Sequence, residues 1–314
     1  MKTPWELLKE SKTKIKTTWR IAFVSALVLG LLIHLPVMLS DIPNHDGLSS
    51  MYFDQNMITS GRWFLTVACG FSSYFTIPWV IGLIGLIWLA LTAAVLTEVL
   101  ELTDPVTITV VSGLLVSFPA LASTFAYVFT MDGYMMALFL VVLAVLFTAK
   151  YPRGYLAGAV CLAFSMGIYQ AYLPFTILLC VYKILLYFME EKGWKEKAKY
   201  LCRYLGMGIA GGVLYYVILQ ILLKLQGKVL DTYQGINSME QMGSSMGILA
   251  TIKGMYVDFL AFTVHGNVLV NNIFSLVACI ILVATVVFLV IRSMIWRKWW
   301  KNPAFFVIMI LLGI

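Results

Sequence analysis

The chain has 314 residues, of which 61% are hydrophobic and only 12% are charged, and its formal net charge is +7. Soluble domains carry about 25% charged residues, so this composition excludes an ordinary soluble domain. Apolar stretches of roughly 16 to 25 residues recur along the whole length, and most could cross a hydrocarbon core about 30 Å thick. The composition therefore predicts an all-α protein that crosses a membrane many times.

The apolar pattern predicts about nine spans. In chain order they lie at about 20–40, 77–98, 106–128, 134–149, 154–169, 172–189, 204–223 and 271–292, and a ninth begins near Pro303. The ninth continues apolar to the last residue, Ile314. We therefore expect residues 1–314 to form one transmembrane domain whose C-terminal portion is incomplete.

Positive charge gathers in the N-terminal segment and in the links after spans four, six and eight. Lys and Arg collect in cytoplasmic loops, so a cytoplasmic N-terminus places all four segments on one side. The link after span two is acidic (Glu98, Glu101, Asp104) and gives no orientation, and Lys183 is close enough to a span end to snorkel. This topology accounts for the net charge, and no basic stripe with interleaved aromatics indicates a nucleic-acid partner.

Polar residues outside the spans gather on the opposite, extracytoplasmic side. The loop at about 41–63 carries Asp41, His45, Asp46, Asp54 and Arg62. Ionisable groups at a membrane surface cost free energy unless they are paired or used, so this loop predicts a site. Further outward candidates are Asp132, Tyr169, Gln170 and His265.

Each candidate also has a plain structural interpretation. Asp46 before Gly47 suits a cap for a short surface helix at about 47–60, and Gly61 suits the C-cap of that helix. Arg62 next to a tryptophan is typical of an interfacial anchor, and Asp132 is typical of a tight turn. The residue pattern alone leaves catalysis and capping equally open for Asp46.

Four short motifs, in this order, resemble a known family: Asn44–Asp46 (NHD), Ser60–Trp63 (SGRW), Phe129–Tyr134 (FTMDGY) and Ser165–Tyr172 (SMGIYQAY). The chain is similar to the phage serotype-converting O-antigen glucosyltransferases, the glucosyl transferase family II. The resemblance implies a multi-span, GT-C-like hexosyltransferase of the bacterial plasma membrane. The implied donor is a polyprenyl-phosphate sugar, glucose above all. The implied acceptor is a cell-surface polysaccharide or its lipid-linked precursor, reached on the extracytoplasmic face.

The resemblance also implies roles for individual residues. Asp46 would be the base that takes the acceptor proton, and Arg62 would bind the donor phosphate, because guanidinium binds phosphate oxygens bidentately. Candidates for substrate contact are Asp41, His45, Asp132, Tyr169, Gln170 and His265. No cofactor is required, although a carboxylate-bound divalent cation is compatible with the sequence. The competing functions are a polyprenyl-linked sugar flippase, which would need a polar midplane, and a non-catalytic scaffold.

Overall fold

The computed structural model describes residues 3, 15–40, 46, 54–70, 72–75, 77–231, 248–262, 272–303 and 305–306, and within these ranges every regular element is a helix. The chain divides into two compact units. One comprises Met1–Lys183 with Lys199–Leu230, and the other comprises Ile184–Ala198 with Asp231–Ile314. Six described helices are long and apolar enough to cross a membrane, so the expected all-α, multi-span class is confirmed.

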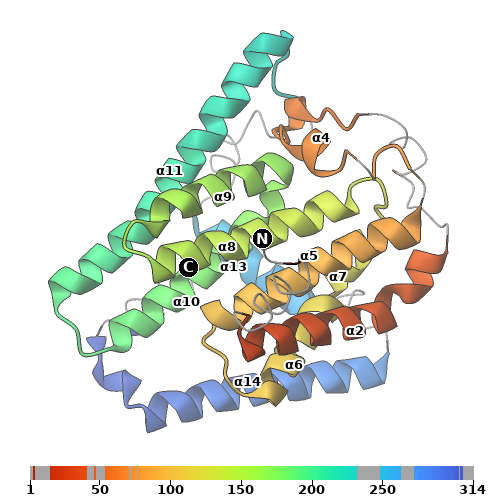
Figure 1. The fold of residues 1–314 in the computed structure, drawn as a ribbon. Coiled ribbons are helices and arrows are strands. Elements are labelled where there is room, and N and C mark those ends of the chain that lie inside the picture. The colour runs from red at the N-terminus through yellow and green to blue at the C-terminus, as the bar shows by residue number, and fades with distance from the viewer. Residues whose placement is uncertain are drawn as a thin grey trace. The chain divides into compact units, whose positions relative to one another are not determined.

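The first unit is a bundle of apolar helices that run side by side. Its main helices are α2 (Thr17–Leu39), α5 (Pro78–Val99), α6 (Pro105–Ser117), α8 (Met131–Lys150), α9 (Gly154–Ile168), α10 (Leu173–Met189, up to Lys183) and α11 (Trp194–Gln226, from Lys199). Figure 1 shows α5 between α2 and α8, with α9 beside α8. Described helices overlap each of the first eight predicted spans, and six of these helices are long and apolar enough to cross a membrane, whereas the ninth predicted span lies mostly outside the described residues.

Small residues allow the helices of this bundle to approach closely. A Cβ on Gly30 of α2 would lie 2.6 Å from Leu86 Cδ2 of α5, and Leu86 itself is fully buried. Gly85 of α5 is similarly covered by the side chain of Met131 from α8. Van der Waals packing at small residues is a main source of helix association in lipid, because lipid tails are as apolar as the side chains.

The third predicted span is not one continuous helix, which corrects the expectation for 106–128. Helix α6 ends at Ser117, Phe118 is extended (φ −60°, ψ 128°), and α7 (Pro119–Thr124) begins at a proline. A proline has no N–H for the helix ladder and forces the preceding residue out of the α region. The sequence therefore encodes a break at Phe118.

The break leaves helix carbonyls without their usual partners, and His34 of α2 bonds one of them. His34 Nε2 donates to the Val116 carbonyl at 2.8 Å, and the imidazole is 2% exposed. Its ring stacks on Phe125 with centroids 3.8 Å apart. A carbonyl that leaves a helix in hydrocarbon needs such a donor, because water is absent there.

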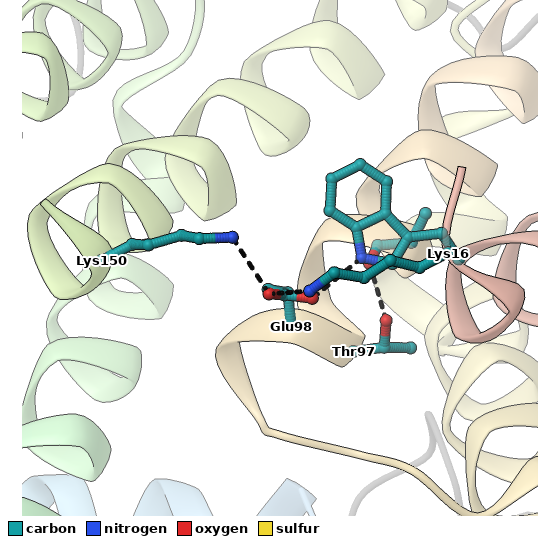
Figure 2. A network of polar contacts seen from close by, with 6 residues as sticks. Lys16, Thr97, Glu98 and Lys150 are labelled. Carbon is teal, nitrogen blue, oxygen red and sulfur yellow. Dashed lines mark hydrogen bonds and ion pairs between the residues drawn. The ribbon is translucent and has the colours of Figure 1, made fainter. Parts of the chain in front are cut away.

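At one end of the first unit, which we call the Glu98 end, a single carboxylate bonds three side chains. Glu98, at the end of α5, accepts from Lys16 Nζ at 2.5 Å, Lys150 Nζ at 3.2 Å and Trp19 Nε1 at 3.1 Å. Figure 2 shows the two lysines reaching Glu98 from opposite sides. The acidic link after span two gave no orientation from the sequence. In the structure its Glu98 lies between basic residues of the N-terminal segment and of the end of α8.

Two further cations bond at the Glu98 end. Lys183 is 8% exposed and forms an ion pair with Glu101 at 2.5 Å, so it is paired rather than snorkelling. Arg203 donates to the carbonyls of Thr148 and Tyr151 at the end of α8, where helix carbonyls lack intrahelical partners. Helix α11 begins at Trp194 rather than near residue 204.

The second unit contains α13 (Ile248–Leu260) and α14 (Ile273–Trp296), with a short turn η5 (Trp299–Lys301) after α14. Helix α13 lies between predicted spans seven and eight, where the sequence predicted no span. Asn272 caps α14 by accepting from the Ser275 N–H at 3.0 Å. After α14, Arg297 lies over the Trp299 ring, a pairing of basic and aromatic residues typical of a membrane interface.

We expect His34→Phe to destabilise the first unit by about 1–3 kcal/mol, the cost of leaving a buried carbonyl without a partner. The phenyl ring keeps the stack on Phe125 but cannot donate to Val116. Denaturant unfolding of the purified protein in mild detergent would measure the change. His34→Gln, which retains an N–H donor, should lose less, and equal stability of His34→Phe and wild type would contradict this role.

Candidate functional site

A chain segment at 54–70 lies across helix ends at the end of the first unit opposite Glu98. The Phe64 N–H donates to the Gly167 carbonyl at the end of α9, at 2.7 Å. Trp63 lies directly on Gly167, where a Cβ would be 2.6 Å from the indole Cε2. The short helix α4 (Leu65–Ala68) follows, and α8 packs against it at Gly133. Figure 1 shows α4 near the ends of α8 and α9.

The described part of the expected surface helix at 47–60 is not α-helical, which corrects that prediction. Residues 54–56 have no helical structure, and only the 3₁₀ turn η1 (Ile58–Ser60) follows. The Arg62 N–H closes the turn by donating to the Met57 carbonyl at 3.0 Å. Gly61 caps η1 with φ 78°, so its predicted capping role is confirmed, although for a shorter turn.

Arg62 projects into a cluster of tyrosines from α8 and from the α9–α10 junction. Its Nη1 donates to the Tyr134 hydroxyl at 3.2 Å, and its Cζ lies 5.1 Å from the centre of the Tyr169 ring. Tyr134 and Tyr169 are stacked with centroids 4.4 Å apart, and Tyr172 meets Tyr169 edge-on. The guanidinium is therefore oriented by a hydrogen bond and a cation–π contact.

Arg62 still has an unused donor. Its Nε is buried and has no hydrogen-bond partner among the described residues, and the neighbouring Trp63 Nε1 is in the same condition. A buried donor without an acceptor costs about 1–3 kcal/mol. Such groups at a candidate site are suited to an acceptor supplied by a ligand, and the charge of Arg62 favours an anion.

Two side chains bond to the turn that carries Arg62. Gln170, from the turn η2 (Gln170–Tyr172), donates through Nε2 to the Ser60 carbonyl at 3.2 Å and to the Tyr215 hydroxyl at 3.0 Å. Tyr215 of α11 in turn donates to the Gly61 carbonyl at 3.0 Å. Sequence reasoning missed Tyr215, because nothing in an apolar span distinguishes it from its neighbour Tyr216.

An apolar groove of about 670 Å³ begins beside this cluster. It is lined by α6, the Phe118 break, α7 and the first part of α10, and by Leu96 of α5 and Leu138 of α8. Among the side chains that line the groove, only those of Thr124, Tyr169 and Tyr172 contain polar atoms. Tyr169 therefore belongs both to the groove and to the surroundings of Arg62.

Asp132 lies in the first turn of α8 rather than in a separate tight turn, and it is 4% exposed. Its Oδ1 accepts from Ser72 Oγ at 2.6 Å and from the Gly133 N–H at 2.9 Å. A carboxylate is favourable at a helix N-terminus. These bonds fasten the segment after α4 to α8, and a substrate contact by Asp132 stays a prediction.

Cys69 lies in the same segment, 54–70, and is fully buried. Burial raises the pKa of its thiol to about 12, with a smaller opposing effect from the hydrogen bond with Ser73. The thiol is therefore protonated at neutral pH, and Cys69 packs as a small hydrophobic residue.

The remaining predicted residues are only partly placed. Asp46 is a half-buried turn residue whose flanking segments lie outside the described residues. Asp41, His45 and His265 also lie outside them. Asp54 is exposed and accepts from the Asn56 N–H at 3.2 Å. Arg62, Tyr169 and Gln170 are thus the predicted residues that the structure brings together.

The architecture and the site define a multi-span membrane protein with a cationic, tyrosine-lined centre beside an apolar groove. The family model described as glucosyl transferase GtrII matches residues 35–314, so the chain belongs to this glucosyl transferase family. No curated protein and no solved structure gives a significant match. Membership makes the chain a glycosyltransferase that uses a sugar donor and an acceptor, and it favours the transferase over the flippase and the scaffold.

A structural role of Asp132 predicts that Asp132→Ala lowers stability by about 1–3 kcal/mol, because the buried Gly133 N–H loses its acceptor and Ser72 Oγ loses its shortest hydrogen bond. Asp132→Asn keeps an acceptor oxygen and should lose less stability and little activity. Thermal unfolding and glucosyl transfer, measured on the same preparations, would separate the two effects. A stable Asp132→Asn protein without activity would instead assign Asp132 to the reaction.

Proposed function

We propose that the protein transfers glucose from a polyprenyl-phosphate donor to a hydroxyl of a cell-surface polysaccharide, or of its lipid-linked precursor, on the extracytoplasmic face of the bacterial plasma membrane. Family membership supports the glucosyl transfer. The donor, the acceptor and the side of the membrane are inferences from the residues of the first unit.

The observation that carries the donor assignment is the junction at Tyr169. One side chain connects an apolar groove of about 670 Å³ with the guanidinium of Arg62, whose buried Nε has no partner among the described residues. A lipid phosphate combines the same two properties, a long apolar chain and an anionic head. We propose that the chain lies in the groove and that the phosphate oxygens accept from Arg62.

The charge distribution of the first unit supports the side assignment. Lys16, Lys150, Lys183 and Arg203 all bond at the Glu98 end. Cytoplasmic ends of spans are enriched in Lys and Arg. We therefore place the Glu98 end and the N-terminus in the cytoplasm. Helix α8 runs 20 residues from Met131 to Lys150, about 30 Å, so the Arg62 end would face outward.

In the proposed reaction a base removes the acceptor hydroxyl proton, and the hydroxyl oxygen attacks the anomeric carbon. The bond from that carbon to the phosphate oxygen breaks, and the phosphate leaves with the electron pair. Arg62 stabilises the charge that develops on the phosphate. We assign the base to Asp46, since a positioned carboxylate is a common acceptor for such a proton. The guanidinium supplies the positive charge, so the proposal requires no cofactor.

The first test concerns the phosphate. Arg62→Ala should raise the KM for the polyprenyl-phosphate donor by roughly 10- to 100-fold, because a charged hydrogen bond is worth about 1.5–3 kcal/mol. Arg62→Lys should recover only part of this, since an ammonium restores the charge but not the bidentate geometry. Initial rates over a range of donor concentrations would measure both. Equal kinetics for Arg62→Lys and wild type would indicate simple interfacial anchoring.

The second test concerns the base. Asp46→Asn should reduce transfer at least ~10²-fold, the usual scale of general-base catalysis, while expression and membrane insertion stay near normal. Asparagine retains a capping oxygen, so a purely capping role predicts little change. A radiolabelled glucose transfer assay would decide between them.

The matched controls for this test are Asp54→Asn and Asp41→Asn, which should cost much less. Asp54 is an exposed carboxylate within the same outward segment. Retained activity in Asp46→Asn together with a loss in either control would move the base to the other carboxylate. If none of the three mattered, the proposed chemistry of this loop would be wrong.

A further inference from the structure

We propose that Tyr215 and Gln170 are positioning residues: they fix the Ser60–Gly61 turn and through it set the guanidinium of Arg62. This inference deepens the proposed function, on which its functional part rests. It gives α11 a part in donor binding, and it gives Gln170 a role other than contact with the sugar.

The hydrogen bonds form a continuous chain from η2 through α11 to the turn. Gln170 Nε2 donates to the Tyr215 hydroxyl at 3.0 Å, and that hydroxyl donates to the Gly61 carbonyl at 3.0 Å. A hydroxyl that accepts from one group while it donates to another is polarised, which strengthens both bonds. The same Gln170 nitrogen bonds the Ser60 carbonyl at 3.2 Å. Two successive carbonyls of the turn are thereby held from one side.

Holding the Gly61 carbonyl also fixes Arg62. The peptide unit is planar, so the direction of the Gly61 carbonyl sets the direction of the Arg62 N–H. That N–H donates to Met57 at 3.0 Å and closes the turn. From this fixed backbone the Arg62 side chain reaches the Tyr134 hydroxyl and the face of Tyr169. Loss of the Tyr215 bond would free the peptide plane next to the cation.

The glycine at position 61 matches the same arrangement. Its φ of 78° is a conformation that other residues adopt at a cost, and a Cβ there would collide with the Tyr215 hydroxyl and with Gln170 Nε2. The two positioning side chains therefore lie against the backbone of the turn with no space between them. Ser60 is 6% exposed, so its carbonyl has little access to an alternative partner in solvent.

The chain offers a matched pair of variants. Tyr215→Phe removes the hydroxyl that bonds Gly61, whereas Tyr216→Phe removes the next hydroxyl along α11. Tyr216 is 58% exposed and has no hydrogen bond within the described residues. Hydrogen–deuterium exchange of a peptide covering 57–64 should become at least ~10-fold faster in Tyr215→Phe and stay unchanged in Tyr216→Phe. Unchanged exchange in Tyr215→Phe would overturn the positioning role, whatever the protein transfers.

The link to the donor is tested on the full-length chain with a diazirine-bearing polyprenyl phosphate that lacks the sugar. Tyr215→Phe should raise the half-saturating probe concentration for cross-linking about 10-fold, the scale of one hydrogen bond. In an Arg62→Ala background the same change should add less than about twofold, because the residue acts through Arg62. An equal effect of Tyr215→Phe in both backgrounds would overturn the proposal.

Two further outcomes separate this proposal from the proposed function. If wild type does not bind the probe, the polyprenyl-phosphate donor is wrong, and the exchange measurement alone decides whether Tyr215 fixes the turn. If wild type binds the probe while Tyr215→Phe speeds exchange without weakening binding, the donor assignment stands and Tyr215 fixes the turn, but the proposed effect of the turn on donor binding through Arg62 is wrong. Gln170→Met, which removes the other hydrogen bonds, should reproduce both effects if Tyr215→Phe fails to fold.

Discussion

A backbone carbonyl that leaves a helix inside a protein needs a new hydrogen-bond donor, and three irregular points in the described part of the first unit receive one from a side chain. At the Phe118 break, His34 donates to Val116. At the end of α8, Arg203 donates to the terminal carbonyls. In the turn before Arg62, Gln170 and Tyr215 bond Ser60 and Gly61. In each case a donor from another helix replaces a lost backbone bond, so a departure from helical geometry also ties two elements together.

The site depends on two of these repairs. The break held by His34 turns the chain from α6 into α7, and both helices line the apolar groove. The repaired turn at Ser60–Gly61 presents Arg62 to Tyr134 and Tyr169. A cation and an apolar groove meet at Tyr169 because the Phe118 break and the Ser60–Gly61 turn are each held by hydrogen bonds from side chains of other elements. The proposed lipid-phosphate donor fits this junction, since its anionic head is stabilised by a cation and its hydrocarbon chain by an apolar groove.

Charge arranges the opposite end by a different rule. The carboxylate of Glu98 lies among cations from the N-terminal segment and from the end of α8, and Glu101 pairs with the buried Lys183. A buried ammonium without a partner would carry a large desolvation cost. The sequence shows Glu98, Glu101 and Asp104 only as an acidic link. In the fold, Glu98 joins the ends of α2, α5 and α8, and Glu101 pairs with Lys183 of α10.

The sequence by itself determined the membrane class, the approximate places of most of the described helices and the family, because hydropathy and short motifs are properties of contiguous residues. It also predicted Arg62, Tyr169 and Gln170, polar residues at the ends of apolar runs, as candidate site residues, and the structure brings them together. It did not distinguish Tyr215 from Tyr216, and it suggested a continuous third span despite Pro119. Only the tertiary structure decided these points. A tyrosine on α11 matters because Gly61, distant in sequence, directs a carbonyl toward it, and such a pairing leaves no local pattern.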